Sequence, residues 1–189
     1  MVPDPQIDRI VRTRRLVLRP WKAEDIEPFA AMNADAEVMR HFPSTLSREQ
    51  TVAGIARVQA HFDRHGWGLF AAEHKGAFIG YIGLFHVPFD AHFTPAVEIG
   101  WRLAREYWNR GLASEGARAC LDFGFSTLGL AEIVAFTTPG NLASLRVMEK
   151  IGMRHDEAGD FDHPRIARGH HLQRHVLYRT IPACTPPRQ

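Results

Sequence analysis

The sequence of 189 residues has few cysteines, no strong excess of either charge and no long apolar run. Its two cysteines, Cys120 and Cys184, are too few for the disulfide framework of a small secreted domain. The N-terminus lacks a charged segment followed by an apolar one, and no stretch approaches the ~18 apolar residues that a membrane-spanning helix needs. We therefore expect a cytoplasmic protein with no membrane partner.

Charge also argues against a nucleic-acid partner. The chain has 23 Lys and Arg against 21 Asp and Glu, a formal net charge of +2, and we interpret the cluster Arg12, Arg14, Arg15 and Arg19 as the solvated face of a strand. A hydrophobic content of 45% is ordinary for a globular protein. Since no repeat or linker interrupts the chain, we expect a single domain over residues 1–189.

Eleven histidines raise the question of a metal site. The densest group is His163, His170, His171 and His175. His171 and His175 are four residues apart, but they lie beside a strand-like run, where the i,i+4 geometry of a helix is not available. We therefore predict no metal ligand set.

Hydrophobic periodicity predicts alternating strands and helices. Ser47 with Gln50 forms a capping-box pattern, Asn141 is a second helix cap, and Gly66 and Gly152 are helix stops. The aromatic residues in 85–95 either floor a substrate cleft or fill the edge of a sheet. The expected strands are 13–20, 67–73, 77–84, 97–103, 132–137 and 176–181, and the expected helices are 24–33, 47–66, 113–129 and 141–151, with a loop at 85–95 and a Pro-rich tail at 182–189.

The segment 97–115 carries the strongest chemical signal. Apolar residues alternate from Val97 to Leu103 and then recur at helical spacing after Ala113, so the period changes across the turn between them. Gly111 and Ala113 keep side chains out of this turn, so backbone N–H groups at a helix N-terminus can bind an anion such as a pyrophosphate. The turn lacks the Lys-Ser/Thr pair of a P-loop and the three glycines of a dinucleotide fold. Similar turns also occur in α/β proteins that bind nothing there.

Three segments carry a resemblance to a known family: Glu98-Ile99-Gly100-Trp101, the run 107–115 (YWNRGLASE) and the run 141–153 (NLASLRVMEKIGM). With the order of elements, they resemble the GNAT superfamily of acyl-CoA-dependent N-acetyltransferases over about residues 12–181. They look closest to the branch of ribosomal-protein N-terminal alanine and serine acetyltransferases. The resemblance implies an α/β (α+β) fold, a mixed and mostly antiparallel twisted sheet of about six to seven strands, flanked by helices and splayed at its central strands.

The resemblance also implies how acetyl-CoA binds. The family's motif Gln/Arg-x-x-Gly-x-Gly/Ala falls on Trp108, Gly111 and Ala113. The main chain of Trp101 and Leu103 is expected to pair with the pantetheine arm like an added strand. Asn141 is expected to act mainly as a helix cap and also to contact the cofactor. A glycine inside a strand, Gly100, fits a bulge or a close approach. The backbone groups implied for the pyrophosphate are those of Asn109, Arg110, Gly111, Leu112, Ala113 and Ser114.

Acetyl transfer needs a neutral amine, and an alkyl amine with a pKa near 10 is mostly charged at neutral pH. Glu98 is the first candidate for a base, or it orients the substrate ammonium without accepting a proton. Where many relatives carry a tyrosine that assists the leaving thiolate, this chain has Met148. Ser144 either takes a modest catalytic or cofactor-contact role or only bonds a backbone carbonyl. No nucleophile set suggests an acyl-enzyme, so direct attack is expected, with backbone N–H groups near Trp101 assisting the oxyanion.

The sequence thus predicts an N-acetyltransferase that moves an acetyl group from acetyl-CoA to a primary amine of a small molecule or a protein N-terminus. It is expected to act as a monomer or homodimer, without a metal. Two alternatives stay open. One is a non-catalytic acyl-CoA-binding sensor module. The other is transfer of a larger acyl group such as succinyl, which would need a cation for the extra carboxylate.

Overall fold

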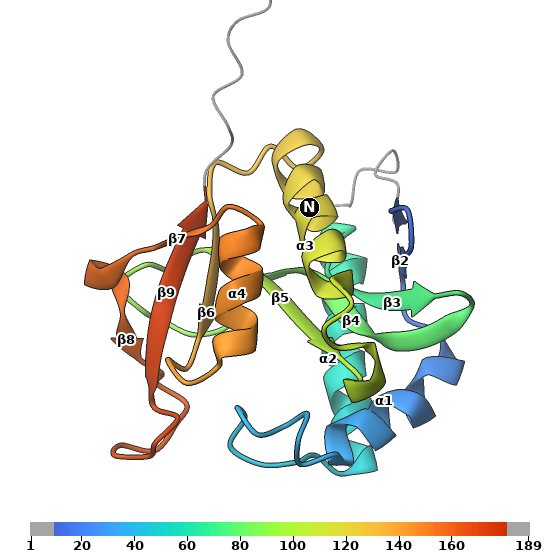
Figure 1. The fold of residues 1–189 in the computed structure, drawn as a ribbon, viewed down its shortest axis with the longest axis horizontal. Coiled ribbons are helices and arrows are strands. Elements are labelled where there is room, and N and C mark those ends of the chain that lie inside the picture. Colours follow the sequence, from blue (N-terminus) through green and yellow to red (C-terminus); the bar gives the residue numbers. More distant parts are fainter. Residues whose placement is uncertain (1–9, 181–189) are drawn as a thin grey trace, which may run out of the picture.

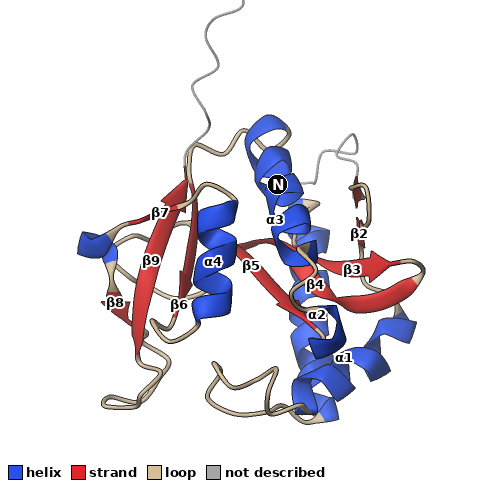
Figure 2. Ribbon diagram, viewed as in Figure 1, coloured by secondary structure: helices blue, strands red, loops and turns tan. Residues whose placement is uncertain are grey.

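The computed structural model describes residues 10–180. Residues 1–9 and 181–189, which include Cys184 and the Pro-rich tail, lie outside the described residues. Within residues 10–180, nine strands form a sheet in the order β1-β2-β3-β4-β5-β6-β9-β7, with β8 paired to β9. Figures 1 and 2 show α3 and α4 in front of this sheet and α2 behind it. The expected α/β fold, with a mostly antiparallel open sheet flanked by helices, is confirmed.

The N-terminal half differs from expectation mainly in its first strand. Residues 13–20 do not form one strand, because the backbone N–H of Thr13 donates to the carbonyl of Leu16 at 2.9 Å and closes a turn there. The capping box is confirmed: Ser47 accepts from the Gln50 N–H, and Gln50 accepts from the Ser47 N–H. The elements are β1 (Val11–Arg12), β2 (Val17–Arg19), the 3-10 turn η1 (Ala23–Asp25), α1 (Ile26–Ala34), α2 (Arg48–His65), β3 (Leu69–His74) and β4 (Ala77–His86).

The C-terminal half contains two short strands that the sequence did not indicate. β7 and β8 have two residues each, too few to show a period. β4 also runs two residues beyond its expected end, so the following loop starts at Val87. The elements are β5 (Val97–Leu103), η2 (Arg105–Tyr107), α3 (Leu112–Ser126), β6 (Ile133–Thr137), α4 (Leu142–Lys150), β7 (Arg154–His155), η3 (Glu157–Gly159), β8 (Phe161–Asp162) and β9 (Arg174–Thr180).

The sheet splays between β5 and β6. These strands run parallel, and their pairing is limited to one position, Glu98 opposite Val134. Beyond it the strands separate, as Figure 1 shows. Gly100 pairs regularly with Gly83, so the bulge suggested for Gly100 is absent there. The irregularity lies in β4 at Gly80, where φ is +133° and a Cβ would lie 2.0 Å from the carbonyl oxygen of Arg102.

Close packing joins the helices to the sheet. A Cβ on Gly116 of α3 would come within 2.5 Å of Ile82 in β4, so this glycine lets the helix approach the strand. On the opposite face, the Arg19 guanidinium bonds Asp25 at 2.8 and 2.9 Å and Glu73 at 2.9 Å. Since the Asp25 side chain is 1% exposed, this network fixes the start of α1 on β2 and β3. Within residues 10–180, no helix has both the length and the apolar character needed to cross a bilayer.

A separate core lies under β6 and β9. It contains Phe93, Val134, Phe161 and Leu177, with Phe89 and Phe136 packed against it. The rings of Phe93 and Phe161 lie 4.9 Å apart. Phe89 and Phe93 of the 87–96 loop therefore fill the edge of the sheet, the second of the two roles considered for this loop.

Candidate active site

The candidate site lies where the splayed strands end. In Figure 1 the carboxyl ends of β5 and β6 and the first turns of α3 and α4 face the same lower edge of the molecule. This edge brings together three groups of residues expected at the site: the end of β5, the turn before α3 and the cap of α4. Glu98 lies at the other end of the opening, at the position where β5 and β6 still pair.

The turn before α3 has the backbone form needed to bind an anion. Asn109 and Gly111 have positive φ values of 58° and 72°, a left-handed conformation that glycine and asparagine tolerate best. Gly111 is the N-cap residue, and no described side chain caps the helix. Among residues 10–180, nothing accepts a hydrogen bond from the N–H groups of Leu112, Ala113 or Ser114. These donors, at the positive end of the helix dipole, can hold a pyrophosphate.

Arg15 and Glu115 hold this turn in place. Glu115, in the first turn of α3, accepts from the Arg15 Nε at 2.6 Å and from the Thr13 hydroxyl at 2.6 Å. Arg15 in turn donates to the carbonyl of Arg110 at 2.9 Å. These bonds lower the pKa of Glu115 against the opposing effect of its burial. The interpretation of Arg15 as part of a solvated strand face missed this role, because Arg15 and Glu115 are about a hundred residues apart in the sequence.

The end of β5 is tied to the same turn. The Trp108 indole N–H donates to the carbonyl of Leu103 at 2.7 Å, a bond that explains why tryptophan suits the first position of the motif here. Leu103 is buried, whereas Trp101 is partly exposed and packs against the main core. Past Glu98 the β5 edge facing β6 has no strand partner among residues 10–180, so its backbone groups can pair with an extended ligand.

The cap of α4 is confirmed. The Asn141 side chain accepts from the Ser144 N–H at 3.3 Å and donates to the Thr137 hydroxyl at 2.9 Å. Among the described residues, no hydrogen bond involves the Ser144 hydroxyl, so the bond to a backbone carbonyl considered above is absent. The Ser144 hydroxyl is thus available to a ligand.

Glu98 is a carboxylate without a partner. It is partly buried, and within residues 10–180 its side chain has no hydrogen bond or ion pair. Burial without compensation raises the pKa of Glu98 to about 8, because a charged carboxylate is disfavoured away from water. A group that titrates so near neutral pH can both accept and release a proton under ordinary conditions.

The loop between α1 and α2 is a site element that sequence reasoning missed. Its Phe42 ring lies 3.9 Å from the guanidinium of Arg102 on β5, and Arg102 donates to Asn33 of α1 at 2.7 Å. His41 lies 3.5 Å from the Thr138 hydroxyl at the end of β6. The loop therefore reaches both splayed strands. Its local sequence shows no period, so only the tertiary contacts reveal it.

The histidines that form a group of three are not those considered from the sequence. The rings of His163 and His175 lie 5.0 Å apart and those of His170 and His171 4.4 Å apart, in two separate pairs. Within the described part of the chain, the group that could hold a metal ion is His61, His65 and His86. The i,i+4 spacing of His61 and His65 in a predicted helix was the available signal, but His86 joins them only in the fold.

Comparison with known proteins identifies relatives of this chain. The family model of the acetyltransferase (GNAT) domain matches residues 15–154. The uncharacterized protein YkkB of Bacillus subtilis (strain 168) is 37% identical over 148 residues, which cover 77% of this chain and 85% of YkkB. The acetyltransferase (GNAT family) of Bacillus anthracis has a solved structure that is 30% identical, with a TM-score of 0.74, and covers 91% of this chain and 98% of its own.

A third comparison bears on the branch that the sequence resembles. RimL, the ribosomal L7/L12 alpha-N-protein acetyltransferase solved in complex with coenzyme A, has a TM-score of 0.72 with this chain. The match covers 91% of this chain and 97% of RimL at 17% identity. At that identity the likeness is one of fold.

Proposed function

The chain belongs to the acetyltransferase (GNAT) family, and from this premise we propose that it transfers an acetyl group from acetyl-CoA to a primary amine by direct attack. The observation that carries the proposal is the pairing of a splayed sheet with an uncapped helix turn. The splay offers unpaired backbone to an extended arm, and the turn offers free N–H groups to a pyrophosphate.

We assign the binding of acetyl-CoA to two backbone surfaces. Residues 109–114 would hold the pyrophosphate, and the β5 backbone at Trp101 and Leu103 would align the pantetheine arm so that the thioester points toward Glu98. Asn141 would keep the first turn of α4 in place beside that arm. The N–H groups at residues 112–114 support this assignment, because they have no partner within residues 10–180 and lie at the positive end of the α3 dipole, where an anion is favoured.

Glu98 is assigned as the general base. In the reaction the amine nitrogen forms a bond to the acetyl carbon, the carbon–sulfur bond breaks, and the proton lost by the amine passes to the Glu98 carboxylate. The pKa of about 8 for Glu98 supports this role, because a base works best when its pKa lies near the operating pH. In the described part of the chain Glu98 also has no cation partner, which leaves it available to an ammonium substrate.

Ser144 is assigned to the departing thiolate. Its hydroxyl has no partner among the described residues, and it stands in the first turn of α4, where the positive end of the helix dipole favours an anion. A thiol pKa near 8.5 means that a thiolate is a fair leaving group, so a hydrogen bond suffices and a strong acid is not needed.

We assign the acceptor side to the loop between α1 and α2. Phe42, stacked on Arg102, and His41, next to Thr138, close the opening on the face that also carries Glu98. The acceptor is a primary amine of a small molecule or of a protein N-terminus. The aromatic residues of the 87–96 loop pack in a separate core, so we do not assign them to the acceptor and assign the loop between α1 and α2 instead.

A thiol-release assay tests the proposal. The protein would be mixed with acetyl-CoA and, in turn, N-terminal peptides, polyamines and aminoglycosides, and the free thiol and the acetylated product would both be measured. Release that depends on one class of amine and yields its amide supports the proposal. Tight acetyl-CoA binding with no transfer to any amine would instead identify the sensor module. Faster transfer from succinyl-CoA than from acetyl-CoA would contradict the choice of acyl group.

A further inference from the structure

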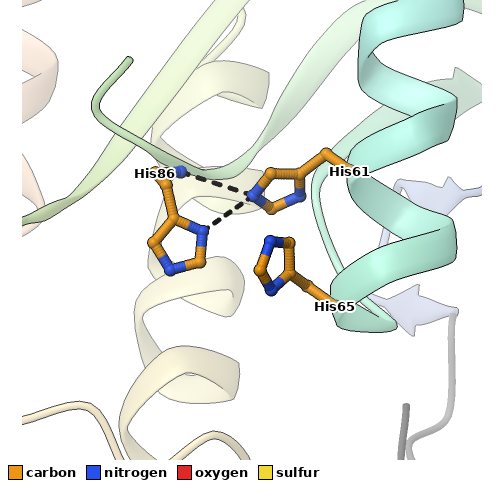
Figure 3. Close-up of side chains that lie close together, drawn as sticks. All are labelled: His61, His65 and His86. Atoms are coloured by element: carbon orange, nitrogen blue, oxygen red, sulfur yellow. Dashed lines mark hydrogen bonds between the residues drawn. The ribbon is translucent and has the colours of Figure 1, made fainter. Parts of the chain in front are cut away.

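Three imidazole rings converge at one end of the sheet, on the side of α2. His61 and His65 lie four residues apart on the last turns of α2, and His86 is the last residue of β4. Figure 3 shows the three rings pointing toward one another from these two elements. Each ring offers one nitrogen such that the three nitrogens lie within 4.8 Å of one another. No element of the acetyl-transfer proposal uses these histidines.

The spacing of the nitrogens suits a small metal ion. The His61 Nε2 lies 2.9 Å from the His86 Nδ1. In a tetrahedral zinc site the metal–nitrogen distance is ~2.0–2.1 Å, which separates neighbouring ligand nitrogens by about 3.3 Å. The distance between the His61 and His86 nitrogens is close to this value, and a nitrogen of His65 lies within 4.8 Å of both, so rotation of the rings about their side-chain bonds would bring the three nitrogens to the spacing of a zinc site. His65 is half-buried, as is His86, and can complete the set.

One ring is already held in the orientation that a ligand needs. The His61 Nδ1 lies 2.8 Å from the carbonyl oxygen of Trp67. Since a carbonyl only accepts hydrogen bonds, Nδ1 carries the proton and Nε2 presents its lone pair to His86, whose backbone N–H lies 3.5 Å away and would give up this long bond to an ion. Metal-binding histidines are usually fixed by such a bond from the second ring nitrogen to a carbonyl. This bond is the feature that distinguishes the group from a simple aromatic stack.

Aromatic side chains enclose two of the three rings. His61 stacks on Phe85 with ring centroids 4.2 Å apart, and Trp67 packs 4.9 Å from both His61 and His86. In the described structure no carboxylate forms an ion pair with any of the three rings.

We propose that His61, His65 and His86 form a binding site for a divalent transition metal ion, above all zinc. The fourth coordination position of the ion would be open to water. Three nitrogen ligands and one open position are an established zinc geometry, and imidazole also suits copper and nickel. In the metal-free state the His86 Nδ1 donates to the His61 Nε2. On binding, that proton moves to the His86 Nε2 as the ring changes tautomer, so His86 stays neutral.

The site would join two elements that flank the acetyl-transfer residues. Phe85, under the His61 ring, pairs across the sheet with Glu98, and His86 pairs with Val97. A bound ion would tie the end of α2 to the end of β4 at this point. Because only the folded chain assembles the three ligands, the ion would raise the melting temperature of the protein.

A metal titration of the untagged protein tests this proposal. After treatment with a chelator and its removal, the protein would be titrated with zinc chloride by calorimetry and with cobalt(II), whose visible absorption reports tetrahedral nitrogen coordination. The expected result is one ion per chain with a dissociation constant in the micromolar range or tighter. Absence of binding in that range would overturn the proposal, whatever the acetyl-transfer activity is.

Two variants make the test specific. His65→Gln removes one ligand from a half-buried position and the ring contacts of His65 with His61 and Trp67, but it leaves the contact of His61 with Trp67 in place, so the variant is expected to fold. Its zinc affinity should fall by more than about 100-fold, since even the loss of a supporting hydrogen bond costs 10–100-fold. His171→Gln, in the other histidine-rich segment, should bind zinc like the wild type. Equal affinity in the His65 variant, or an equal loss in the His171 variant, would contradict the site.

Discussion

Replacing Glu98 by glutamine separates a base from a residue that merely fills space. Glutamine has nearly the same shape and keeps the hydrogen-bonding capacity, but it cannot accept the amine's proton. General-base assistance is worth about 10²–10⁴ in rate, so we expect kcat/KM of Glu98→Gln to fall by that factor at about pH 8. Glu106→Gln, which changes an exposed carboxylate of η2, is the control and should leave the rate unchanged.

The pH profile gives the sharper signature. With a pKa of about 8, Glu98 is deprotonated in roughly one molecule in ten at pH 7. The wild-type rate should therefore rise ~tenfold per pH unit below 8 and level off above it, for an acceptor whose amine has a pKa near 10. The glutamine variant must use the small fraction of free amine, so its rate should keep rising toward the pKa of the acceptor.

Glu98→Gln is expected to lower the rate of acetyl transfer but to raise the stability of the fold. Folding raises the pKa of Glu98 from 4.5 to about 8, so deprotonation opposes folding as the pH rises between these values. The cost at pH 8 is at most about 5 kcal/mol, and Glu98→Gln removes it. Urea unfolding at pH 8 without ligands should show the variant as more stable than the wild type. A variant that levels off near pH 8 like the wild type, or that is less stable there, would refute the reasoning.

Three further substitutions probe the turn, the cap and the buried ion pair. Gly111→Asp should weaken acetyl-CoA binding by at least about tenfold in calorimetry, because the new carboxylate faces the pyrophosphate. The control Gly111→Asn tolerates the same φ of 72° and should bind acetyl-CoA nearly as the wild type does. Equal losses of affinity in the two variants would contradict the site. Asn141→Ala should cost about 1 kcal/mol in thermal unfolding through the lost cap, and an unchanged melting temperature would argue against it. Arg19→Met leaves the Asp25 carboxylate buried without its ion-pair partner and should lower the free energy of urea unfolding by about 3–5 kcal/mol. Arg48→Met, which breaks an exposed ion pair, should lower it by only about 0–1 kcal/mol. Similar losses in the two variants would contradict the role given to the Arg19 network.

The parts of the fold that the sequence predicted well are those with a long period or a defined cap. The strand Val97–Leu103 matches its expected bounds, and α2 follows its capping box at Ser47 and ends at Gly66. Both signals are local, so tertiary contacts did not override them. The two-residue strands β7 and β8 exist only because β9 lies beside them, and nothing in their own sequence marks them.

The site divides along the same line. The turn at Gly111 and the cap at Asn141 could be predicted because the residues that form each of them are close together in the sequence. The elevated pKa of Glu98 depends on burial by distant elements and has no local signal. The contacts of Phe42 with Arg102, and of His61 with His86, join residues tens of positions apart. A pattern read along the chain does not register such contacts.

Calorimetric titration of the purified protein with acetyl-CoA is the decisive experiment, because every assignment at the site depends on that ligand occupying the splay and the turn. We expect micromolar binding of one acetyl-CoA per chain, weakened in Gly111→Asp and retained in Gly111→Asn and in Glu98→Gln. If the wild-type protein did not bind acetyl-CoA in that range, the proposed site would be wrong.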